Sequence, residues 1–266
     1  MHYEFSSIVD PGRIRPNNED AVVVLPDRGL ALLADGMGGY NAGEVASGMA
    51  TAQLGCELGR WMQSAPPDTP PGDIRRAIET RVELANRSVF DAARTHAAYA
   101  GMGTTLVVAV FRGPCLMLGH IGDSRAYRWR DGELVQLTHD HSLLQEQLDT
   151  GLITPQEAAV STQRNLVTRA LGVQDSVRID IDEHRVQPGD CYLLCSDGLS
   201  DMLDDPMIAF VLGRRGALPT KARALVREAN SRGGRDNISV VLVQASTRKP
   251  GLAWLPAWMS GSHAFG

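Results

Sequence analysis

Five aspartates stand at the ends of short apolar stretches of this 266-residue chain, and their positions suggest metal chemistry. They are Asp20, Asp35, Asp123, Asp197 and Asp236. Short runs rich in leucine and β-branched residues, bounded by glycine, asparagine and aspartate, are typical of buried strands. Carboxylates at strand ends can converge at one edge of a sheet, whereas inside a strand each would be buried without a partner at considerable cost. An all-oxygen cluster of this kind suits hard cations such as Mg²⁺ or Mn²⁺.

A single aspartate at such a position is better explained as a turn residue, because aspartate commonly occupies turns. Five of them, each in a different glycine- or asparagine-containing motif, favour a metal site instead. The sequence therefore predicts a cation-binding edge built from strand ends.

An arginine precedes the first of these aspartates, in the stretch Arg15-Pro-Asn-Asn-Glu19-Asp20. Arg15 could form an ordinary surface salt bridge with a neighbouring acid. It could also act as a planar, permanently charged fork for two phosphate oxygens beside a metal site. The residues alone leave both interpretations open.

Glycines follow Asp35 in the stretch Ala34-Asp-Gly-Met-Gly-Gly-Tyr-Asn-Ala-Gly-Glu44. A dinucleotide-binding turn is excluded, because Asn41 stands where the third glycine belongs and Asp35 would face the pyrophosphate. Asp35 can instead bridge two cations. The Gly36 carbonyl would then be a further oxygen ligand, since glycine allows close approach of the backbone.

Histidines and cysteines have structural interpretations. His139 and His141 flank Asp140 in a predicted loop without a third nitrogen ligand nearby, so we expect both to be structural. His120 lies within a predicted strand and is expected to be a core or rim residue. None of the four cysteines belongs to a phosphate loop of the CxxxxxR kind, which argues against a cysteine phosphatase.

Composition narrows the class of protein. A hydrophobic fraction of 43% with interspersed charges indicates a globular chain with a sizeable core. The net charge of -5 argues against nucleic acid as a partner. No apolar run approaches the ~20 residues of a membrane helix, and the first residues do not form a signal peptide. With scattered cysteines, we expect a reduced, cytoplasmic protein.

The order of predicted elements indicates an α+β fold with mainly antiparallel sheets. Helices are expected at about 43–62, 73–98 with Asp73 as N-cap, 142–148, 154–159 and 219–230. Strands are expected as two runs within about 20–35, and at 104–111, 115–121, 124–130, 133–137, 177–186, 190–196 and 238–245. The polar stretch from His139 to Gly172 is an insertion between strands, and such insertions often carry recognition.

Further motifs complete an ordered set. They are GMGTT from Gly101 to Thr105, GDSR from Gly122, SDGL from Ser196 and RDN from Arg235. Together with RxxNED and DGMGG they resemble the metal-dependent Ser/Thr protein phosphatases, the type 2C or PPM family. The resemblance runs from about residue 4 to 245, and THDHS with NLVTRALG is similar to the bacterial branch.

The resemblance implies a four-layer α/β/β/α sandwich, with two mainly antiparallel sheets flanked by helix pairs. A flap insertion is expected at about 139–172. One phosphatase domain would occupy residues 1–247, followed by a C-terminal tail, 248–266, of unknown role.

The resemblance also implies the roles of the site residues. Asp35 would bridge two metals, with the Gly36 carbonyl, Asp197 and Asp236 completing the first. Glu19 and Asp20 would hold metal-bound waters near the second, and Asp123 with Asp197 would form a third site. Arg15 would bind the phosphate, so Arg15, Glu19 and Asp20 are the expected catalytic residues. The expected metal residues are Asp20, Asp35, Gly36, Asp123, Asp197 and Asp236. The histidine that many animal relatives carry after Asp-Gly is Met37 here, so a metal-bound water is the expected proton donor to the leaving group.

The expected reaction is hydrolysis of phosphoserine or phosphothreonine by a hydroxide that bridges two Mn²⁺ or Mg²⁺ ions, with a third ion expected. Phosphoproteins would be the substrates, and a bacterial Ser/Thr kinase the opposing enzyme. We expect a monomer without a membrane span. Two alternatives are a pseudophosphatase that keeps the fold as a scaffold, and a hydrolase of small phosphate esters.

Overall fold

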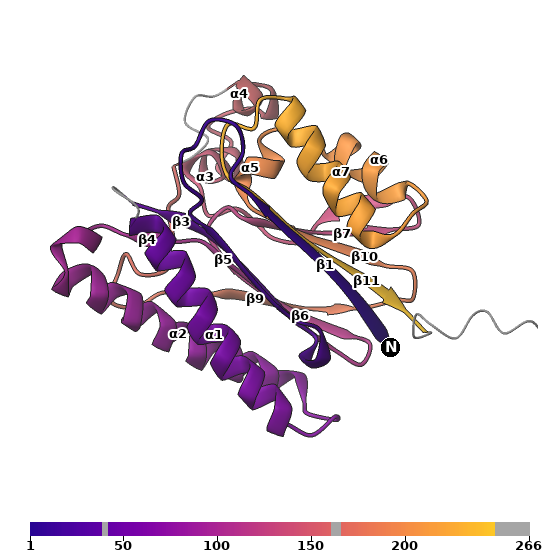
Figure 1. Cartoon of the computed structure of the whole chain (residues 1–266), viewed down its shortest axis with the longest axis horizontal. Helices are drawn as coiled ribbons and strands as arrows, with labels where there is room; N and C mark the ends of the chain where they lie inside the picture. Colours follow the sequence, from indigo (N-terminus) through magenta and orange to yellow (C-terminus); the bar gives the residue numbers. More distant parts are fainter. Residues whose placement is uncertain (39–41, 161–165, 248–266) are drawn as a thin grey trace, which may run out of the picture.

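Two antiparallel sheets face each other in the computed structural model, which describes residues 1–38, 42–160 and 166–247 (Figure 1). The first sheet has the order β1 (His2–Asp10), β11 (Ile238–Ser246), β10 (Cys191–Cys195), β7 (Arg125–Arg130) and β8 (Glu133–Gln136). The second has the order β2 (Asp20–Leu25), β3 (Leu30–Met37), β5 (Leu106–Arg112), β6 (Cys115–Ile121) and β9 (Asp180–Arg185), with β4 (Gly103–Thr104) paired to β3. All neighbouring strands of both sheets run antiparallel.

Helices cover the two outer faces. Figure 1 shows α1 (Ala42–Ser64) and α2 (Pro71–Thr95) beside the second sheet, and α6 (Asp205–Gly213) and α7 (Leu218–Ser231) beside the first. The shorter helices α3 (Leu143–Asp149), α4 (Pro155–Val160) and α5 (Asp197–Ser200) gather at one end of the sandwich. Two 3-10 turns, η1 (Pro26–Arg28) and η2 (Ala97–Tyr99), complete the elements.

The core has three apolar layers because side chains alternate between the two faces of a strand. Leu32 of β3 faces α1 and α2, whereas Leu33 faces the other sheet. In the same way Leu193 of β10 faces α6 and α7, and Leu194 points between the sheets. These alternating contacts produce four layers, so the predicted α+β sandwich is confirmed.

Several element boundaries differ from the sequence prediction. Helix α2 begins at Pro71 after Pro70, without a side-chain cap, so the prediction that Asp73 is the N-cap was wrong. Proline suits the first helical position because its missing N–H needs no partner there, and Asp73 instead pairs with Arg76 one turn on. The strand expected at 177–186 is confined to Asp180–Arg185.

Strand β1 and helix α6 were missed altogether, as were the single-turn helix α5 and the 3-10 turns η1 and η2. Strand β1 lies at a sheet edge with most side chains partly exposed, so it lacks an apolar run. Helix α6 is apolar along most of its length and shows no helical period.

The insertion predicted at about 139–172 contains α3 and α4. Ser142 caps α3 by accepting a hydrogen bond from the Gln145 N–H at 3.2 Å. Thr154 and Glu157 form a reciprocal capping box at the start of α4. Residues 161–165 of this insertion, and the tail 248–266, lie outside the described residues.

Asp190 anchors the loop before β10. Its carboxylate accepts hydrogen bonds from Arg130 Nε at 2.6 Å and Nη2 at 2.7 Å, from the Gln187 N–H at 2.7 Å and from the Tyr192 hydroxyl at 3.0 Å. Burial raises the pKa of Asp190, but these hydrogen bonds outweigh it and hold the pKa below its ordinary value. A carboxyl with a lowered folded-state pKa adds stability above its unfolded pKa of about 4, and that stability is lost as pH falls through the folded-state pKa.

Asp190→Ala should therefore lower the free energy of unfolding at neutral pH by about 2 kcal/mol or more, because it leaves Arg130 unpaired. Urea denaturation measures the change, with Asp182→Ala on the exposed part of β9 as a control that should change it little. Equal effects of the two substitutions would contradict this account.

Candidate metal centre

The five aspartates meet at one edge of the sandwich. Asp20 begins β2 and lies opposite Asp35 of β3 in the sheet register. Asp123 follows β6, Asp197 begins α5 directly after β10, and Asp236 precedes β11. Antiparallel pairing brings these ends together, since Leu106 at the start of β5 pairs with Ile121 at the end of β6. A hydrogen bond of 2.8 Å from Ser196 Oγ to Asp20 Oδ2 joins the edges of the two sheets.

Crowded carboxylates give this edge a strongly negative potential. Burial raises the pKa of Asp20 to about 6, although the hydrogen bond from Ser196 opposes the shift. Burial and the charge of Asp140 raise the pKa of Asp123 to about 6. Loss of hydration, followed by the charges of the other carboxylates, raises the pKa of both Asp35 and Asp197 well above the ordinary value.

The donor set fits a hard divalent cation. Asp20 is 7% exposed, and its Oδ1 atom is buried without a hydrogen-bond partner. All the donors are oxygens, which Mg²⁺ and Mn²⁺ prefer. In the described residues, no three histidine, cysteine or carboxylate side chains are close enough to hold an ion in the positions shown. Backbone carbonyl oxygens and water, which these ions also accept as ligands, would therefore complete a coordination sphere here.

Gly36 belongs to one of the close backbone contacts of this edge. A Cβ atom built on it would lie 2.1 Å from the Gly43 carbonyl oxygen and 2.7 Å from that of Glu19. The Gly36 N–H also donates to the Glu19 carbonyl at 3.1 Å. Only glycine therefore allows β3, the start of α1 and Glu19 to approach one another here.

Arg15 lies at the rim of the carboxylate group. Its Nη2 is 2.6 Å from Asp236 Oδ2, and its side chain is 52% exposed. The hydrogen bond to Asp236 raises the pKa of Arg15. The arginine thus forms a salt bridge within the cluster, with a partner 221 positions away and not with its sequence neighbours.

Hydroxyl and amide side chains hold the aspartates in place, and sequence reasoning did not single them out. Asn237 accepts from the Glu19 N–H at 2.8 Å and donates to the Pro11 and Asn17 carbonyls at 3.0 and 2.9 Å. Thr105 Oγ1 accepts from the Asp35 N–H at 2.9 Å. The only sequence signal was that these residues fall inside the motifs.

A cavity of about 260 Å³ adjoins Asp123 and Asp197. Ser142 and Leu148 from the insertion line it, together with Asp201. The insertion therefore forms one wall of the space beside the carboxylates.

The histidines have structural roles, as the sequence predicted. His141 Nδ1 lies 3.1 Å from the Gly122 nitrogen, and its ring stacks on His120 with centroids 4.7 Å apart. His120 Nε2 lies 2.8 Å from the His139 carbonyl oxygen. Burial lowers the pKa of both His120 and His141.

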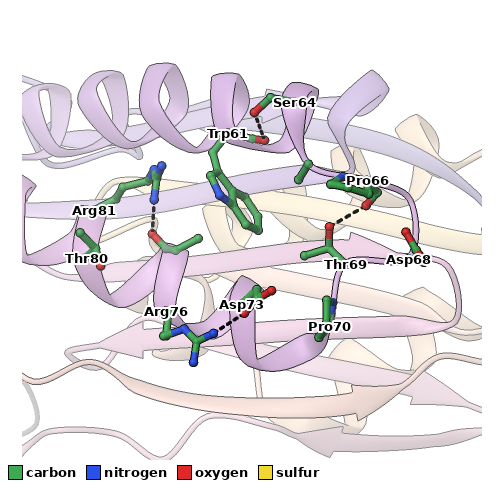
Figure 2. Close-up of a pocket in the computed structure, with 12 residues that line it drawn as sticks. Trp61, Ser64, Pro66, Asp68, Thr69, Pro70, Asp73, Arg76, Thr80 and Arg81 are labelled. Carbon is green, nitrogen blue, oxygen red and sulfur yellow. Dashed lines mark hydrogen bonds and ion pairs between the residues drawn. The ribbon is translucent and has the colours of Figure 1, made fainter.

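A larger cavity, of about 760 Å³, lies between the adjoining ends of α1 and α2 (Figure 2). Trp61, Thr69, Arg76 and Arg81 are among its lining residues. None of the motif aspartates lines it, so its size does not make it the catalytic site.

Comparison with known proteins decides the family. The profile of the protein phosphatase 2C family matches residues 15–228. The chain belongs to this family. The serine/threonine phosphatase stp of Listeria welshimeri is 37% identical over 254 residues, which cover 94% of this chain and 98% of that protein. The protein phosphatase PhpP of Streptococcus pneumoniae is 39% identical over 243 residues, 90% of this chain and 96% of that protein.

Solved structures of the 2C family agree. The serine/threonine phosphatase PstP/Ppp of Mycobacterium tuberculosis has a TM-score of 0.85 and 37% identity, and the match covers 92% of this chain and all of that one. The catalytic domain of PstP in complex with two manganese ions has a TM-score of 0.81 and 38% identity, over 92% of this chain and 98% of that one. The predicted resemblance to the bacterial branch and the predicted fold are both confirmed.

The raised pKa of Asp35 generates a prediction for the metal-free protein. A carboxyl whose folded-state pKa is raised lowers the free energy of unfolding as pH rises from its unfolded pKa to its folded-state pKa. Asp35→Asn removes this charge. In chelator at neutral pH it should therefore increase the free energy of unfolding, by about 1.4 kcal/mol for each unit by which the pKa is displaced.

The gain should shrink as pH falls towards the unfolded pKa of about 4, because the parent carboxyl is then protonated in the unfolded chain as well as in the folded one. Urea denaturation across this pH range measures it, with Asp27→Asn on the exposed turn η1 as the control. A gain that does not depend on pH would show that the buried charge is not its cause.

Proposed function

We propose that this chain is a metal-dependent protein phosphatase that hydrolyses phosphoserine and phosphothreonine. The observation that carries the proposal is the convergence of five aspartates at one edge of the sandwich, with Asp20 Oδ1 buried and unpartnered. Membership of the 2C family and the two manganese ions of the PstP structure support it.

The individual roles that we propose are those that the resemblance to the 2C family implies. Asp35 would bridge two ions, with the Gly36 carbonyl, Asp197 and Asp236 as further ligands of one of them. Glu19 and Asp20 would hold the water shell of the other. Asp123 and Asp197 border the same cavity, so together they would bind a third ion. Either Mn²⁺ or Mg²⁺ suits these oxygen ligands.

The chemistry divides between the ions and the chain. Divalent cations held by these carboxylates would supply an activated water as the nucleophile and would offset charge on the phosphoryl oxygens. Asp236 would share its charge with a cation, which would weaken its salt bridge to Arg15. The exposed guanidinium would then be available to hold two phosphoryl oxygens and orient the ester. Met37 offers no titratable group, so the chain supplies no acid for the leaving group at that position.

The alternatives have less support. A pseudophosphatase would lack part of the carboxylate set, and all five aspartates are present here. A hydrolase of small esters would need an enclosed pocket, whereas we propose that the wall formed by the insertion receives a protein segment.

The cellular setting is also part of the proposal. We infer phosphoprotein substrates, an opposing Ser/Thr kinase, a monomeric enzyme and a cytoplasmic location. None of the helices in residues 1–38, 42–160 and 166–247 provides the apolar length of a membrane span. The domain limits 1–247 and the separate tail 248–266 stay predictions.

Hydrolysis of a phosphothreonine peptide tests the function. Activity should require added Mn²⁺ or Mg²⁺, disappear in excess chelator and resist reagents that trap cysteine nucleophiles. Release of phosphate is the measurement, with a small aryl phosphate as the comparison substrate. Full activity in chelator would refute the metal mechanism, and a strong preference for the aryl ester would favour the small-ester alternative.

Arg15→Ala tests the phosphate role. KM for the phosphopeptide should rise roughly tenfold, since a charge-assisted contact is lost, while calorimetry should still detect the bound ions. Arg13→Ala serves as the matched control, because Arg13 contacts the Gly234 carbonyl through its backbone N–H. An unchanged KM in Arg15→Ala would contradict the assignment.

Asp123→Asn separates the third ion from the other two. Asp123 should contact only the outer ion, so the variant should keep two ions by calorimetry while kcat falls, and high Mn²⁺ should partly restore it. Asp197→Asn, by contrast, should nearly abolish turnover and reduce the number of bound ions. If Asp123→Asn lost all the ions, or kept full activity at low Mn²⁺, the third-site assignment would fail.

A further inference from the structure

A small basic cavity lies among the helices that cover the first sheet, between the end of α6 and residues 220–227 of α7. Its volume is about 210 Å³. Five of its nine lining residues are cationic and none is acidic, although the chain as a whole carries a net charge of -5. The cationic residues are Arg214, Arg215, Lys221, Arg223 and Arg227.

Within the part of the chain that the structure describes, the four arginines of this basic cavity have no carboxylate partner in a salt bridge. On the same helix, by contrast, Arg232 pairs with Glu228 at 3.4 Å. Helix α7 therefore balances its charge at its far end but not beside the cavity.

The contacts that these cations do make keep the charge at the surface. Arg214 lies over the ring of Phe210, 5.9 Å from its centroid, and Phe210 is 63% exposed. Lys221 Nζ donates to the Leu212 carbonyl at 2.6 Å and lies 5.9 Å from the centroid of Trp129. These neutral contacts position the cations without neutralising them.

Interaction with the helix dipole stabilises only some of the five cations around the cavity. Arg214 and Arg215 follow the C-terminal end of α6, where cations are stabilised by the helix dipole. Arg223 and Arg227 are four positions apart within α7, and like charges at that spacing repel. Lys221 lies in the first turn of α7, where a cation is disfavoured. The arrangement thus costs electrostatic free energy that a bound anion would recover.

We propose that this basic cavity is a second anion-binding site, which takes carboxylate or phosphate groups from an acidic segment of a peptide. Several guanidinium groups around one concavity suit planar or tetrahedral oxyanions. The volume accommodates one or two acidic side chains, and exposed Phe210 offers an apolar contact beside them. An extended polyanion such as nucleic acid would also meet the net negative charge of the rest of the molecule.

The site is separate from the metal centre. Helix α7 has 14 residues, so at about 1.5 Å per residue it spans roughly 20 Å. The cavity is lined by α7 residues from Thr220 to Arg227, and Asp236 lies beyond the end of the helix, just before β11. Binding there would not require a metal ion, a phosphorylated residue or catalysis, so the inference does not depend on the proposed function.

A fluorescent peptide of alternating glutamate and serine, without phosphate, tests the proposal. Its anisotropy is measured against the full chain in chelator, so that binding through metal ions at the aspartate edge does not contribute. Arg223→Glu/Arg227→Glu should weaken binding roughly tenfold or more, and Arg223→Gln/Arg227→Gln should give an intermediate loss. A thermal unfolding transition verifies that each variant is folded. If Arg223→Glu/Arg227→Glu does not fold, the loss of binding in Arg223→Gln/Arg227→Gln decides the test.

Arg87→Glu/Arg185→Glu is the matched control, because it changes the net charge equally at two exposed arginines elsewhere. It should bind the peptide as the parent does. Absent binding to the parent, equal losses in the cavity and control variants, or unchanged binding in the cavity variants would each overturn the proposal. The proposal would also be overturned if anionic phospholipid vesicles or duplex DNA bound more tightly than the peptide and lost binding in the same cavity variants. The ligand would then not be a peptide.

Discussion

Electrostatic repulsion among the aspartates at one edge of the sandwich is the constraint on which the rest of the structure depends. Asp20 and Asp35 are direct neighbours across two strands, where like charges are unfavourable. The chain holds them there through strand pairing and through hydroxyl groups such as Ser196, which donates to Asp20 at 2.8 Å. Packing of three apolar layers has to outweigh this repulsion, because the polar contacts lower it only in part.

The same constraint explains why the supporting residues are small and polar. Ser196 accepts from the Ser239 N–H at 2.9 Å while it donates to Asp20, so one hydroxyl satisfies both sheets at once. Asn237 fixes the backbone of Glu19 with its carbonyl and two upstream carbonyls with its amide. An acidic residue in place of Ser196 or Asn237 would add to the repulsion among the aspartates. A basic residue there would cancel part of the negative potential that attracts a cation.

The sequence predicted those parts of the molecule that depend on local patterns. Strand Cys115–Ile121 has the predicted limits. The turn predicted at Asp131-Gly132 is also present, because both residues adopt the positive φ that such a turn requires. The aspartates were found because each borders an apolar run. The partner of Arg15 is 221 positions away, and no local pattern reveals so distant a contact. The basic cavity was missed for the same reason, since a net charge of -5 conceals a local cluster of opposite sign.

The insertion is fastened to the metal edge through the backbone. His141 accepts at Nδ1 from the Gly122 N–H at 3.1 Å and donates its own N–H to the Gly122 carbonyl at 2.9 Å. Its carbonyl accepts from Thr168 N–H at 2.8 Å, so both ends of the insertion converge on one histidine. Gly122 directly precedes Asp123, and its φ of +98° is suited to glycine. A displacement of the insertion is therefore transmitted to Asp123 before it reaches Asp20 or Asp35, which belong to the paired strands β2 and β3.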